Sequence, residues 1–365
     1  MTPADKRLPQ LPEPVYFVLK GRARWNDVFI ARDSPPPIET VWERFDSDPV
    51  ATWVLQTFIQ LKRRGLAVHL VDRFIPGKIC VVGLWHIGSR DLMGRSYNVV
   101  VQADCCRPAV ADHVIVQNPS CIRSPTDHLV YHWPQPGLRH RDPGRGDRIE
   151  TVVYRGTDNN LWDPLKKATF SDALAEIGVT FVYEKNGCPT LQSASWTNYR
   201  EADIVLAMRD LTEYDERIKP ATKLTNAWLA GVPAILGPES AYRDLRTDDL
   251  DYIEARSVSD VITAIRRLRE NPMLYSAMRE RACHRASQFS DDSIAQLWRN
   301  TLAGPIADGY RQWVKRPMFV QSLTAVVTHP FLYLRHKRTL RRYLIERAQG
   351  PTLLGSQSIE TFPQR

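Results

Sequence analysis

The chain has 365 residues, of which 43% are hydrophobic and 25% charged, and its formal net charge is +8. This length favours two domains over one, and the apolar fraction excludes an intrinsically disordered chain. The positive charge suits anionic small molecules, nucleic acid or an anionic membrane surface, and does not choose among them.

The N-terminal 14 residues are rich in proline and contain no apolar core of a signal peptide. No run of about 18 uninterrupted apolar residues occurs, so we expect no membrane span. The cysteines show no CxxC or other paired spacing, which favours a reduced, cytoplasmic protein with buried thiols. The six cysteines are Cys80, Cys105, Cys106, Cys121, Cys188 and Cys283.

The first half of the chain alternates short apolar runs with helices or loops. Residues 50–64 carry apolar side chains at helical spacing and end at Gly65, which predicts a helix. Short apolar runs that alternate with helices or loops are typical of a mostly parallel sheet in an α/β domain. We expect strands at 15–19, 67–71, 79–84, 98–102 and 113–117.

Composition changes to Pro, Gly, Arg and Asp over residues 134–147, which indicates a domain boundary. The same alternation then starts again. We therefore predict a first domain at 1–147, a second at 148–303, and a basic helical tail at 304–365. In the second domain we expect strands at 149–154, 179–183, 203–208, 234–236 and 252–254, and helices at 161–177, 220–230, 258–269 and 272–288.

Residues 219–233 predict a helix with an anion site at its start. Thr222 can cap the first turn, and Gly231 can end the helix in the left-handed conformation. Lys219 and Lys223 lie where the helix dipole disfavours a cation by about 0.3–1 kcal/mol, and a bound anion would reverse that sign. Asn226 shares a face with Lys223, within reach of whatever a bound phosphate is attached to. The alternative is a solvated lysine pair on an ordinary helix.

Residues 223–233 read Lys-Leu-Thr-Asn-Ala-Trp-Leu-Ala-Gly-Val-Pro. This segment resembles the donor-site helix of GT-B glycosyltransferases of the family-four type. The resemblance implies two Rossmann-like domains whose mostly parallel sheets face each other across a cleft. It also implies that the second domain holds a nucleotide-diphosphate sugar, with Lys223 near the diphosphate and Asn226 at the ribose hydroxyls.

Two positions depart from the family pattern. Asn226 replaces the usual glutamate, so it can hydrogen-bond a hydroxyl group but brings no charge. The other carboxylate of the family's Glu-x7-Glu pair falls at Ile218, which cannot serve. These departures leave open a protein that binds the donor and does not transfer the sugar.

Further candidates for donor binding follow two predicted strands. Gly156 allows backbone amides to approach a phosphate closely at a strand end, with a tight turn as the alternative. Arg243 can bind a phosphate or pair with Asp244 or Asp248 on the surface, and residues 184–195 would flank the nucleobase. The predicted donor-binding residues are Arg155, Gly156, Thr157, Lys223, Leu224, Asn226, Glu239, Ser240, Tyr242 and Arg243.

In the first domain, His86 and Asp104 each follow a strand and are candidates to orient or deprotonate an acceptor hydroxyl group. A purely structural role is the alternative for both. His128 and His132 lie four residues apart on a predicted strand, where that spacing does not converge on a metal. We therefore expect no metal and no cofactor.

The C-terminal tail interleaves basic residues between 335 and 342 with apolar ones. A solvated basic helix is one interpretation. A peripheral contact with an anionic membrane surface is the other, and it would suit a lipid-linked or polysaccharide acceptor.

The sequence favours a metal-independent glycosyltransferase of the hexosyltransferase type, active in polysaccharide biosynthesis. It would move a sugar from a nucleotide-diphosphate sugar to a hydroxyl group of a glycan, lipid-linked or other acceptor, and the resemblance implies retention. The alternatives are a GT-B-shaped sugar-nucleotide epimerase and a non-enzymatic protein that binds nucleic acid or a nucleotide sugar. Scattered basic residues and the lack of an RNA-module motif argue against nucleic acid.

Overall fold

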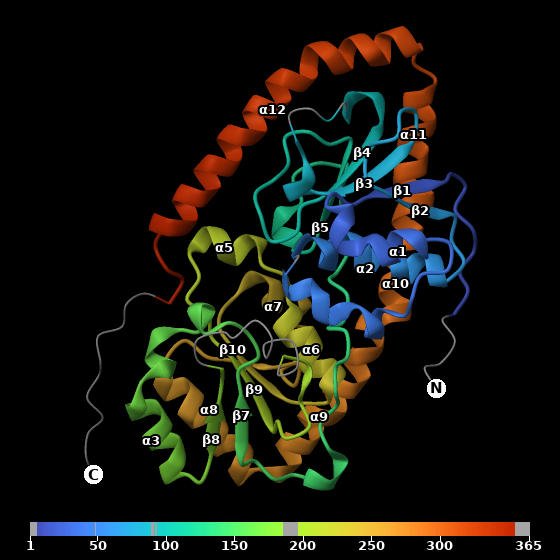
Figure 1. The fold of residues 1–365 in the computed structure, drawn as a ribbon. Helices are drawn as coiled ribbons and strands as arrows, with labels where there is room; N and C mark the ends of the chain where they lie inside the picture. The colour runs from blue at the N-terminus through green and yellow to red at the C-terminus, as the bar shows by residue number, and fades with distance from the viewer. Residues whose placement is uncertain (1–5, 48, 89–90, 92, 185–195, 355–365) are drawn as a thin grey trace. The chain divides into compact units, whose positions relative to one another are not determined.

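A computed structural model describes residues 6–47, 49–88, 91, 93–184 and 196–354 (Figure 1). The chain divides into two compact units. The first unit contains Met1–Gly137 and Ser287–Tyr343, and the second contains Leu138–Ala286 and Leu344–Arg365. Each unit is a parallel sheet covered by helices, which confirms the predicted α/β fold of two Rossmann-like units.

The sheet of the first unit has the strand order β2-β1-β3-β4-β5-β6, and every pair of neighbours is parallel. All five strands predicted in this half form, with ends shifted by a residue or two. The strands are β1 (Val15–Val18), β2 (Val68–Val71), β3 (Ile79–Gly83), β4 (Tyr97–Val101), β5 (His113–Val116) and β6 (Asp127–Leu129).

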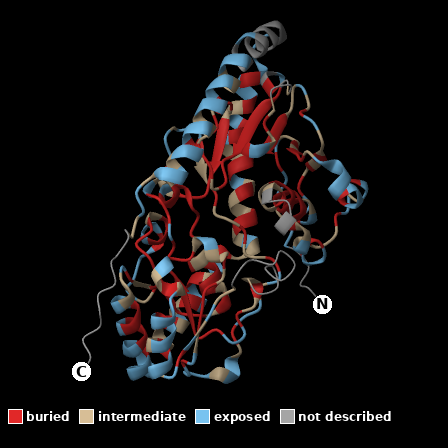
Figure 2. Ribbon diagram, turned by 60° about the vertical axis from the view of Figure 1, so that its left-hand side comes forward, coloured by how far each residue is buried: buried red, intermediate tan, exposed pale blue. Residues whose placement is uncertain are grey.

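The central strands β3, β4 and β5 are buried along their whole length because helices cover the sheet (Figure 2). The predicted helix at 50–64 is α2 (Pro49–Arg63), and its residues Leu55 and Phe58 are fully buried. Before α2 the chain forms α1 (Asn26–Ile30) and the 3-10 turns Arg22–Trp25, Ile38–Thr40 and Trp42–Ser47. After α2 it forms the 3-10 turns Leu84–His86, Met93–Arg95 and Pro119–Cys121.

The first unit also includes helices from the C-terminal part of the chain. Ile294, Trp298 and Ile306 belong to the same apolar core as Phe17 and Phe58. Residues 287–303 therefore pack with the first unit, whereas the sequence analysis placed them in the second domain. The elements here are the 3-10 turn Ser287–Phe289, α10 (Asp291–Thr301), the π-helical turn Leu302–Ile306, α11 (Ala307–Val314) and α12 (Met318–Gln349).

The sheet of the second unit has the order β11-β10-β9-β7-β8 and is also parallel throughout. Its strands are β7 (Thr151–Val153), β8 (Thr180–Val182), β9 (Ile204–Ala207), β10 (Ala234–Leu236) and β11 (Ile253–Glu254). Its helices are α3 (Ala168–Glu176), α5 (Glu213–Ile218), α6 (Thr222–Ala230), α7 (Ser240–Leu245), α8 (Val258–Glu270) and α9 (Pro272–Ala286), with 3-10 turns at Pro143–Arg145, Asp158–Asn160 and Asp163–Lys166.

Two predictions for the second unit need correction. The helix expected at 161–177 begins only at Ala168, because residues 163–166 form a separate 3-10 turn that contains Pro164. Helices α5 and α7 are not among the helices predicted from the sequence. In α6 the residue before the helix is Ala221, and no side chain caps the first turn, so the capping role predicted for Thr222 is wrong. The predicted end is correct, since Gly231 follows with a φ of 71°.

The segment predicted as a domain linker is bonded into the second unit. The backbone amides of Arg139, Arg141 and Asp142 donate to the carbonyl groups of Thr197, Ala230 and Arg200. The buried carboxylate of Asp203 accepts hydrogen bonds from Arg141, from Arg145, and from the backbone amides of residues 150 and 151. The first unit ends at Gly137, ten residues before the predicted boundary.

No helix in the described part of the chain is long and apolar enough to cross a membrane. The described cysteines are free thiols, and all of them are buried as predicted except Cys283, which is exposed. The sulfur atoms of the adjacent Cys105 and Cys106 lie 4.0 Å apart.

Candidate functional site

The start of α6 lies against the carboxyl end of β7. The Lys223 ammonium donates a hydrogen bond to the carbonyl oxygen of Arg155, which comes two residues after the strand. In a parallel sheet this edge is where ligands bind, and the start of α6 adds the positive end of a helix dipole. The structure therefore brings together Lys223 and Arg155, two residues that the sequence analysis assigned to one site.

Gly156 makes this approach possible. A Cβ atom at Gly156 would lie 2.7 Å from the Lys223 Nζ atom and 2.9 Å from the Tyr154 hydroxyl oxygen. Tyr154 is only 2% exposed, so its ring cannot move aside easily. Close packing around the lysine therefore leaves no room for a side chain at Gly156 unless its neighbours shift, and the predicted approach of its backbone amide to a phosphate stays a prediction.

Aromatic rings surround the two cations. The Lys223 Nζ atom lies 5.4 Å from the ring centroids of both Tyr154 and Trp196. The Arg155 guanidinium carbon lies 5.9 Å from the ring of the buried Tyr199. The buried Nε atom of Arg155 donates no hydrogen bond within the described part of the chain, and burial lowers the pKa of this side chain. This half-buried guanidinium keeps unused capacity to bind an acceptor oxygen.

Positive charge accumulates around Lys223. Burial, followed by the nearby charges of Arg209, Lys219 and Arg155, lowers the pKa of Lys223 to about 7, and Glu239 acts in the opposite direction. An ordinary lysine has a pKa near 10.5, so the site disfavours the ammonium form strongly. A bound anion would remove this penalty, because an opposite charge favours the charged form of the lysine.

Glu239 is bound to Arg209 and is not available to a ligand. The Arg209 Nε atom lies 2.9 Å from Glu239 Oε1, and a second guanidinium nitrogen binds the other carboxylate oxygen. Arg209 is 7% exposed and Glu239 only 2%. The direct contact with a donor that we predicted for Glu239 is therefore replaced by a buried bidentate ion pair, of the geometry that fixes both side chains.

The remaining predicted residues of α6 and of the loop after β7 are buried or half-buried. Leu224 is fully buried in the core, so only its backbone can face a ligand. Asn226 is 8% exposed, one turn after the start of the helix. Thr157 is half-buried, and its hydroxyl accepts a hydrogen bond from Asn160 at 2.7 Å.

The predicted site residues on α7 differ in burial: Tyr242 is buried, and Arg243 is exposed on the surface. The backbone amide of Ser240 donates to the carboxylate of Glu216 on α5, whereas Tyr242 is fully buried. Arg243 is exposed and makes two hydrogen bonds to Glu254, at 2.7 and 2.6 Å. The structure thus pairs Arg243 on the surface, as one interpretation allowed, but with Glu254 instead of Asp244 or Asp248.

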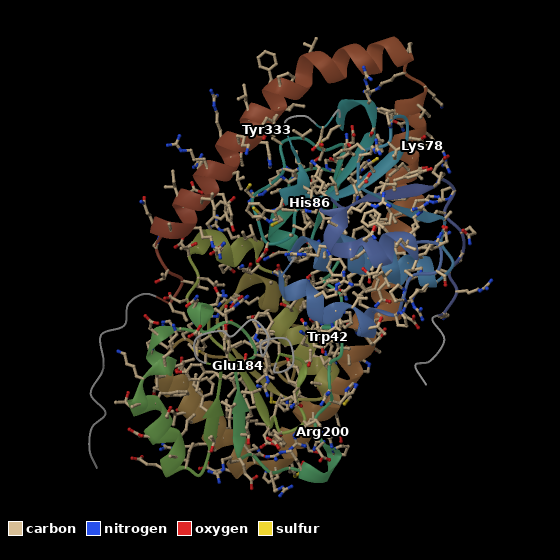
Figure 3. All side chains as sticks on the ribbon, in the orientation of Figure 1. Trp42, Lys78, His86, Glu184, Arg200 and Tyr333 are labelled. Atoms are coloured by element: carbon tan, nitrogen blue, oxygen red, sulfur yellow. The ribbon has the colours of Figure 1, made fainter. Side chains whose placement is uncertain are left out.

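In the first unit, His86 lies just after β3, in the 3-10 turn Leu84–His86 (Figure 3). The backbone amide of Lys20 donates to His86 Nδ1 at 3.3 Å. In the neutral ring the proton is therefore on Nε2, which can donate a hydrogen bond but cannot accept a proton. This geometry fits the predicted orienting role and argues against the base role.

Lys20 also forms an ion pair with Asp91, whose Oδ2 atom accepts the Gly88 amide at 2.6 Å. Asp104 is half-buried and follows β4, which is the neighbour of β3 in the sheet. His86 and Asp104 therefore share the carboxyl edge of this sheet. The backbone carbonyl of Asp104 accepts a hydrogen bond from the Tyr343 hydroxyl at 3.3 Å.

No group of three or more His, Cys, Asp or Glu suited to a metal ion occurs within the described ranges. His113 Nδ1 and His128 Nε2 are 2.7 Å apart and bond to each other. Of the predicted nucleobase segment, residues 184–195, only Glu184 lies within the described residues.

The sequence analysis missed four charged residues near these two sheet edges. Arg209 follows the buried strand β9, so the strand-end criterion that selected Arg155 could have found it. Lys20 follows β1 in the same way. Asp91 and Glu216 lie in a loop and in a helix that the sequence pattern did not single out. Each of the four is fixed by a partner distant in sequence, or by a turn that composition does not reveal.

No family model matches this chain, and no curated protein matches it. Among solved structures, AviGT4, a glycosyltransferase involved in avilamycin A biosynthesis, is similar at 13% identity and a TM-score of 0.49, over 81% of this chain and 99% of that one. Anabaena HepE in complex with UDP and glucose is similar at 13% identity and a TM-score of 0.46, over 80% of this chain and 100% of that one. A chain of the GtfA/B complex has 10% identity and a TM-score of 0.43, over 65% of this chain and 58% of that one. These are similarities of fold.

Proposed function

We propose that this protein is a glycosyltransferase that uses a nucleotide-diphosphate sugar. In the reaction, the bond between the anomeric carbon and the diphosphate breaks, and a new bond forms to an acceptor hydroxyl oxygen, which loses its proton. The leaving diphosphate carries the developing negative charge, so its neutralisation is the main electrostatic task of the catalyst.

One observation carries the proposal. At the carboxyl end of β7, the Lys223 ammonium is placed beside Arg155, with the charges of Arg209 and Lys219 close by. The nearby carboxylate, Glu239, is held by Arg209. Burial and the nearby cations disfavour the ammonium form of Lys223, and a bound diphosphate would relieve this penalty without a metal ion.

The proposed roles follow from this placement. Lys223 and the unused Arg155 Nε atom bind the diphosphate, and the Gly156 amide lies beside them. Asn226 hydrogen-bonds the ribose. In the first unit, His86 donates from Nε2 to an acceptor oxygen, and Asp104 is the candidate base. The acceptor is a glycan or a lipid-linked sugar, in keeping with synthesis of a polysaccharide by a cytoplasmic protein, and retention of configuration is the outcome that the family resemblance implies.

The first experiment identifies the donor. Thermal unfolding of the whole chain is measured with UDP-, GDP-, dTDP- and CMP-sugars, because a ligand that binds only the folded state raises the transition temperature. We expect one class of nucleotide-diphosphate sugar to stabilise the protein. CMP-sugars, which have a single phosphate, should not. Equal response to all of them, or to none, would contradict the proposal.

The second experiment tests Lys223. Loss of a hydrogen bond to a charged group costs about 1.5–3 kcal/mol, so Lys223→Ala should weaken donor binding by about tenfold or more in calorimetry. Lys166→Ala is the matched control, because Lys166 is a half-buried lysine of the same unit that pairs with Asp163. Unchanged affinity in Lys223→Ala would remove this lysine from the site.

The third experiment separates transfer from its alternatives. Incubation of the donor alone distinguishes an epimerase, which would change the sugar without an acceptor. A protein that binds the donor and never transfers it would show stabilisation and no product with any acceptor. With an acceptor present, His86→Ala should lower the rate of transfer and leave the affinity for the donor unchanged.

A further inference from the structure

Helix α12 exposes a row of large side chains along one face. We define the outer stripe of α12 as Val327, Phe331, Leu334, Arg338, Arg341 and Ile345. Successive members are three or four residues apart, so they lie above one another on the same side of the helix. The exposed fractions are 54% for Val327, 72% for Phe331, 56% for Leu334 and 48% for Ile345. An exposed apolar row of this kind is unusual for a helix that faces only water.

The opposite face of the helix is fixed against the protein. His336 is 3% exposed and Tyr343 is 1% exposed. They are seven residues apart and therefore share a face. The Tyr343 hydroxyl donates to the backbone carbonyl of Asp104. These contacts set the rotation of α12 and turn the outer stripe away from the packed side, and Figure 2 colours most of the described C-terminal part of this helix as exposed.

The charges of this helix before Glu346 have a single sign. Between residues 318 and 345 the sequence contains five Lys or Arg residues and no Asp or Glu. Arg335 and Lys337 flank the outer stripe, whereas Arg338 and Arg341 belong to it. Among the described side chains, no ion pair joins any of these four to a carboxylate. The stripe thus combines apolar side chains with cations that the protein itself does not neutralise.

We propose that the outer stripe of α12 docks on an anionic lipid bilayer surface. Phe331 and Leu334 enter the boundary between headgroups and acyl chains. Arg338 and Arg341 contact the lipid phosphates, and the basic side chains on the flanks reach the headgroup layer with their long stems. A solvated basic helix explains the charge but not the exposed phenylalanine and leucine. This surface is independent of the proposed donor site, and it stands if another activity is found there.

The test measures binding of the full chain to lipid vesicles. Co-sedimentation is compared for vesicles of phosphatidylcholine alone and of phosphatidylcholine mixed with phosphatidylglycerol, at low and high salt. We expect the mixed vesicles to bind the protein, the neutral ones to bind it much more weakly, and salt to reduce binding because charged lipid attraction is screened. No binding to the mixed vesicles would overturn the proposal.

Two double variants test the two halves of the stripe. Phe331→Ser with Leu334→Ser removes the apolar part, and Arg338→Glu with Arg341→Glu reverses the charge. Each should lower the partition onto mixed vesicles at least about tenfold. All four positions are on the exposed face, so the fold should be retained, and circular dichroism checks this.

Matched controls change similar residues elsewhere. Met273→Ser alters an apolar side chain on α9 that is 85% exposed, and Arg266→Glu with Arg267→Glu reverses two exposed charges on α8. Both controls should bind vesicles like the unaltered protein. If the controls lose binding to the same degree, or if the serine variant binds unchanged, the stripe is not a lipid-docking surface. Tight binding of single-stranded RNA that the stripe variants abolish would assign the surface to a different partner.

Discussion

The carboxyl edges of the two sheets differ in how their charged side chains are paired. At the edge in the first unit, Lys20 is neutralised by Asp91, and His86 accepts a backbone amide. At the edge in the second unit, Lys223 is placed near three further cations, and the nearby Glu239 is held by Arg209. Both sheets are parallel, but the carboxyl edge of the first has paired charges and that of the second has a cluster of cations.

Under the proposed function, we expect this difference to favour different ligands in the two units. Where cations lie close together, the charged form of each is disfavoured, and a bound anion lowers this free-energy cost. A site whose charges are already paired offers hydrogen bonds to a neutral ligand, such as a hydroxyl group, and little net attraction to an anion. The contrast matches a charged donor in the second unit and a neutral acceptor group in the first.

The largest expected effect on the free energy of unfolding, and the strongest test of this difference, concerns the ion pair of Arg209 and Glu239. Arg209→Met leaves a buried carboxylate without its partner, which costs about 3–5 kcal/mol of unfolding free energy. Urea unfolding followed by fluorescence measures the loss. The double variant Arg209→Met with Glu239→Gln removes both charges and should recover at least half of it. A single variant as stable as the unaltered protein would mean that Glu239 is not confined to Arg209 and can neutralise Lys223.

The second effect concerns the space beside Lys223. Gly156→Ala places a methyl group where the ammonium and the Tyr154 hydroxyl now lie, and overpacking of this kind costs about 1–3 kcal/mol. We expect a lower unfolding free energy and a donor affinity reduced about tenfold. Gly237→Ala is the control, because its new Cβ would be 3.6 Å from the nearest atom, an ordinary contact. Normal donor binding by Gly156→Ala would show that Lys223 does not need its observed position.

The third effect is the pH dependence of donor binding. The pKa of Lys223 is lowered to about 7 in the folded protein, so above that pH the side chain is mostly neutral, and a bound diphosphate must restore its proton. Affinity for a nucleotide sugar should therefore fall as pH rises above about 7, by up to about tenfold per pH unit. A nucleotide sugar has no terminal phosphate monoester, so the dependence belongs to the protein. Calorimetry in buffers of different ionisation enthalpy measures the proton uptake, which Lys223→Met should abolish.

The same lowered pKa has a defined effect on stability. Because the folded-state pKa is lower than the unfolded value of 10.5, folding disfavours the protonated lysine. The cost is fully present below about pH 7 and is lost as pH rises toward 10.5. Without donor, stability should therefore increase with pH over this window, and less so in Lys223→Met. The opposite slope in the contribution of this residue would contradict the assignment.

The smallest effect is expected in the first unit. The side chains of Lys20 and Asp91 are 34% and 18% exposed, so their ion pair is partly solvated and contributes less than about 1 kcal/mol. Asp91→Asn should change the unfolding free energy by less than that amount and leave donor affinity unaltered. An effect as large as that of Arg209→Met would mean that the two edges do not differ in the way described.

Sequence patterns predicted the central strands well because these strands are buried on both faces. The runs at residues 79–84 and 203–208 are short and almost wholly apolar, and each became a central strand. Gly231 also gave a correct helix end, since its left-handed conformation is a local requirement. Local chemistry of this kind is readable without knowledge of the tertiary structure.

Other features depend on partners that are distant in the chain. Glu239 looked like a ligand-binding side chain, but Arg209, 30 positions earlier, holds both of its oxygens. The segment 287–303 looked like the end of the second domain, yet Trp298 packs in the core with Phe17. Amphipathic helices show which face is buried and do not show against which unit, so the sequence alone could not decide this.

The bonding of residues 138–148 into the second unit has a consequence for handling the protein. This stretch is rich in arginine and would be cut readily by trypsin if it were an extended tether. Its amides instead donate to the carbonyl groups of Thr197, Ala230 and Arg200, and the guanidinium groups of Arg141 and Arg145 bind Asp203. Limited digestion should therefore spare the sites after Arg141 and Arg145 under native conditions. The substitution Asp203→Asn should expose these two sites to trypsin. Cleavage after Arg141 or Arg145 would therefore indicate that the second unit is no longer intact.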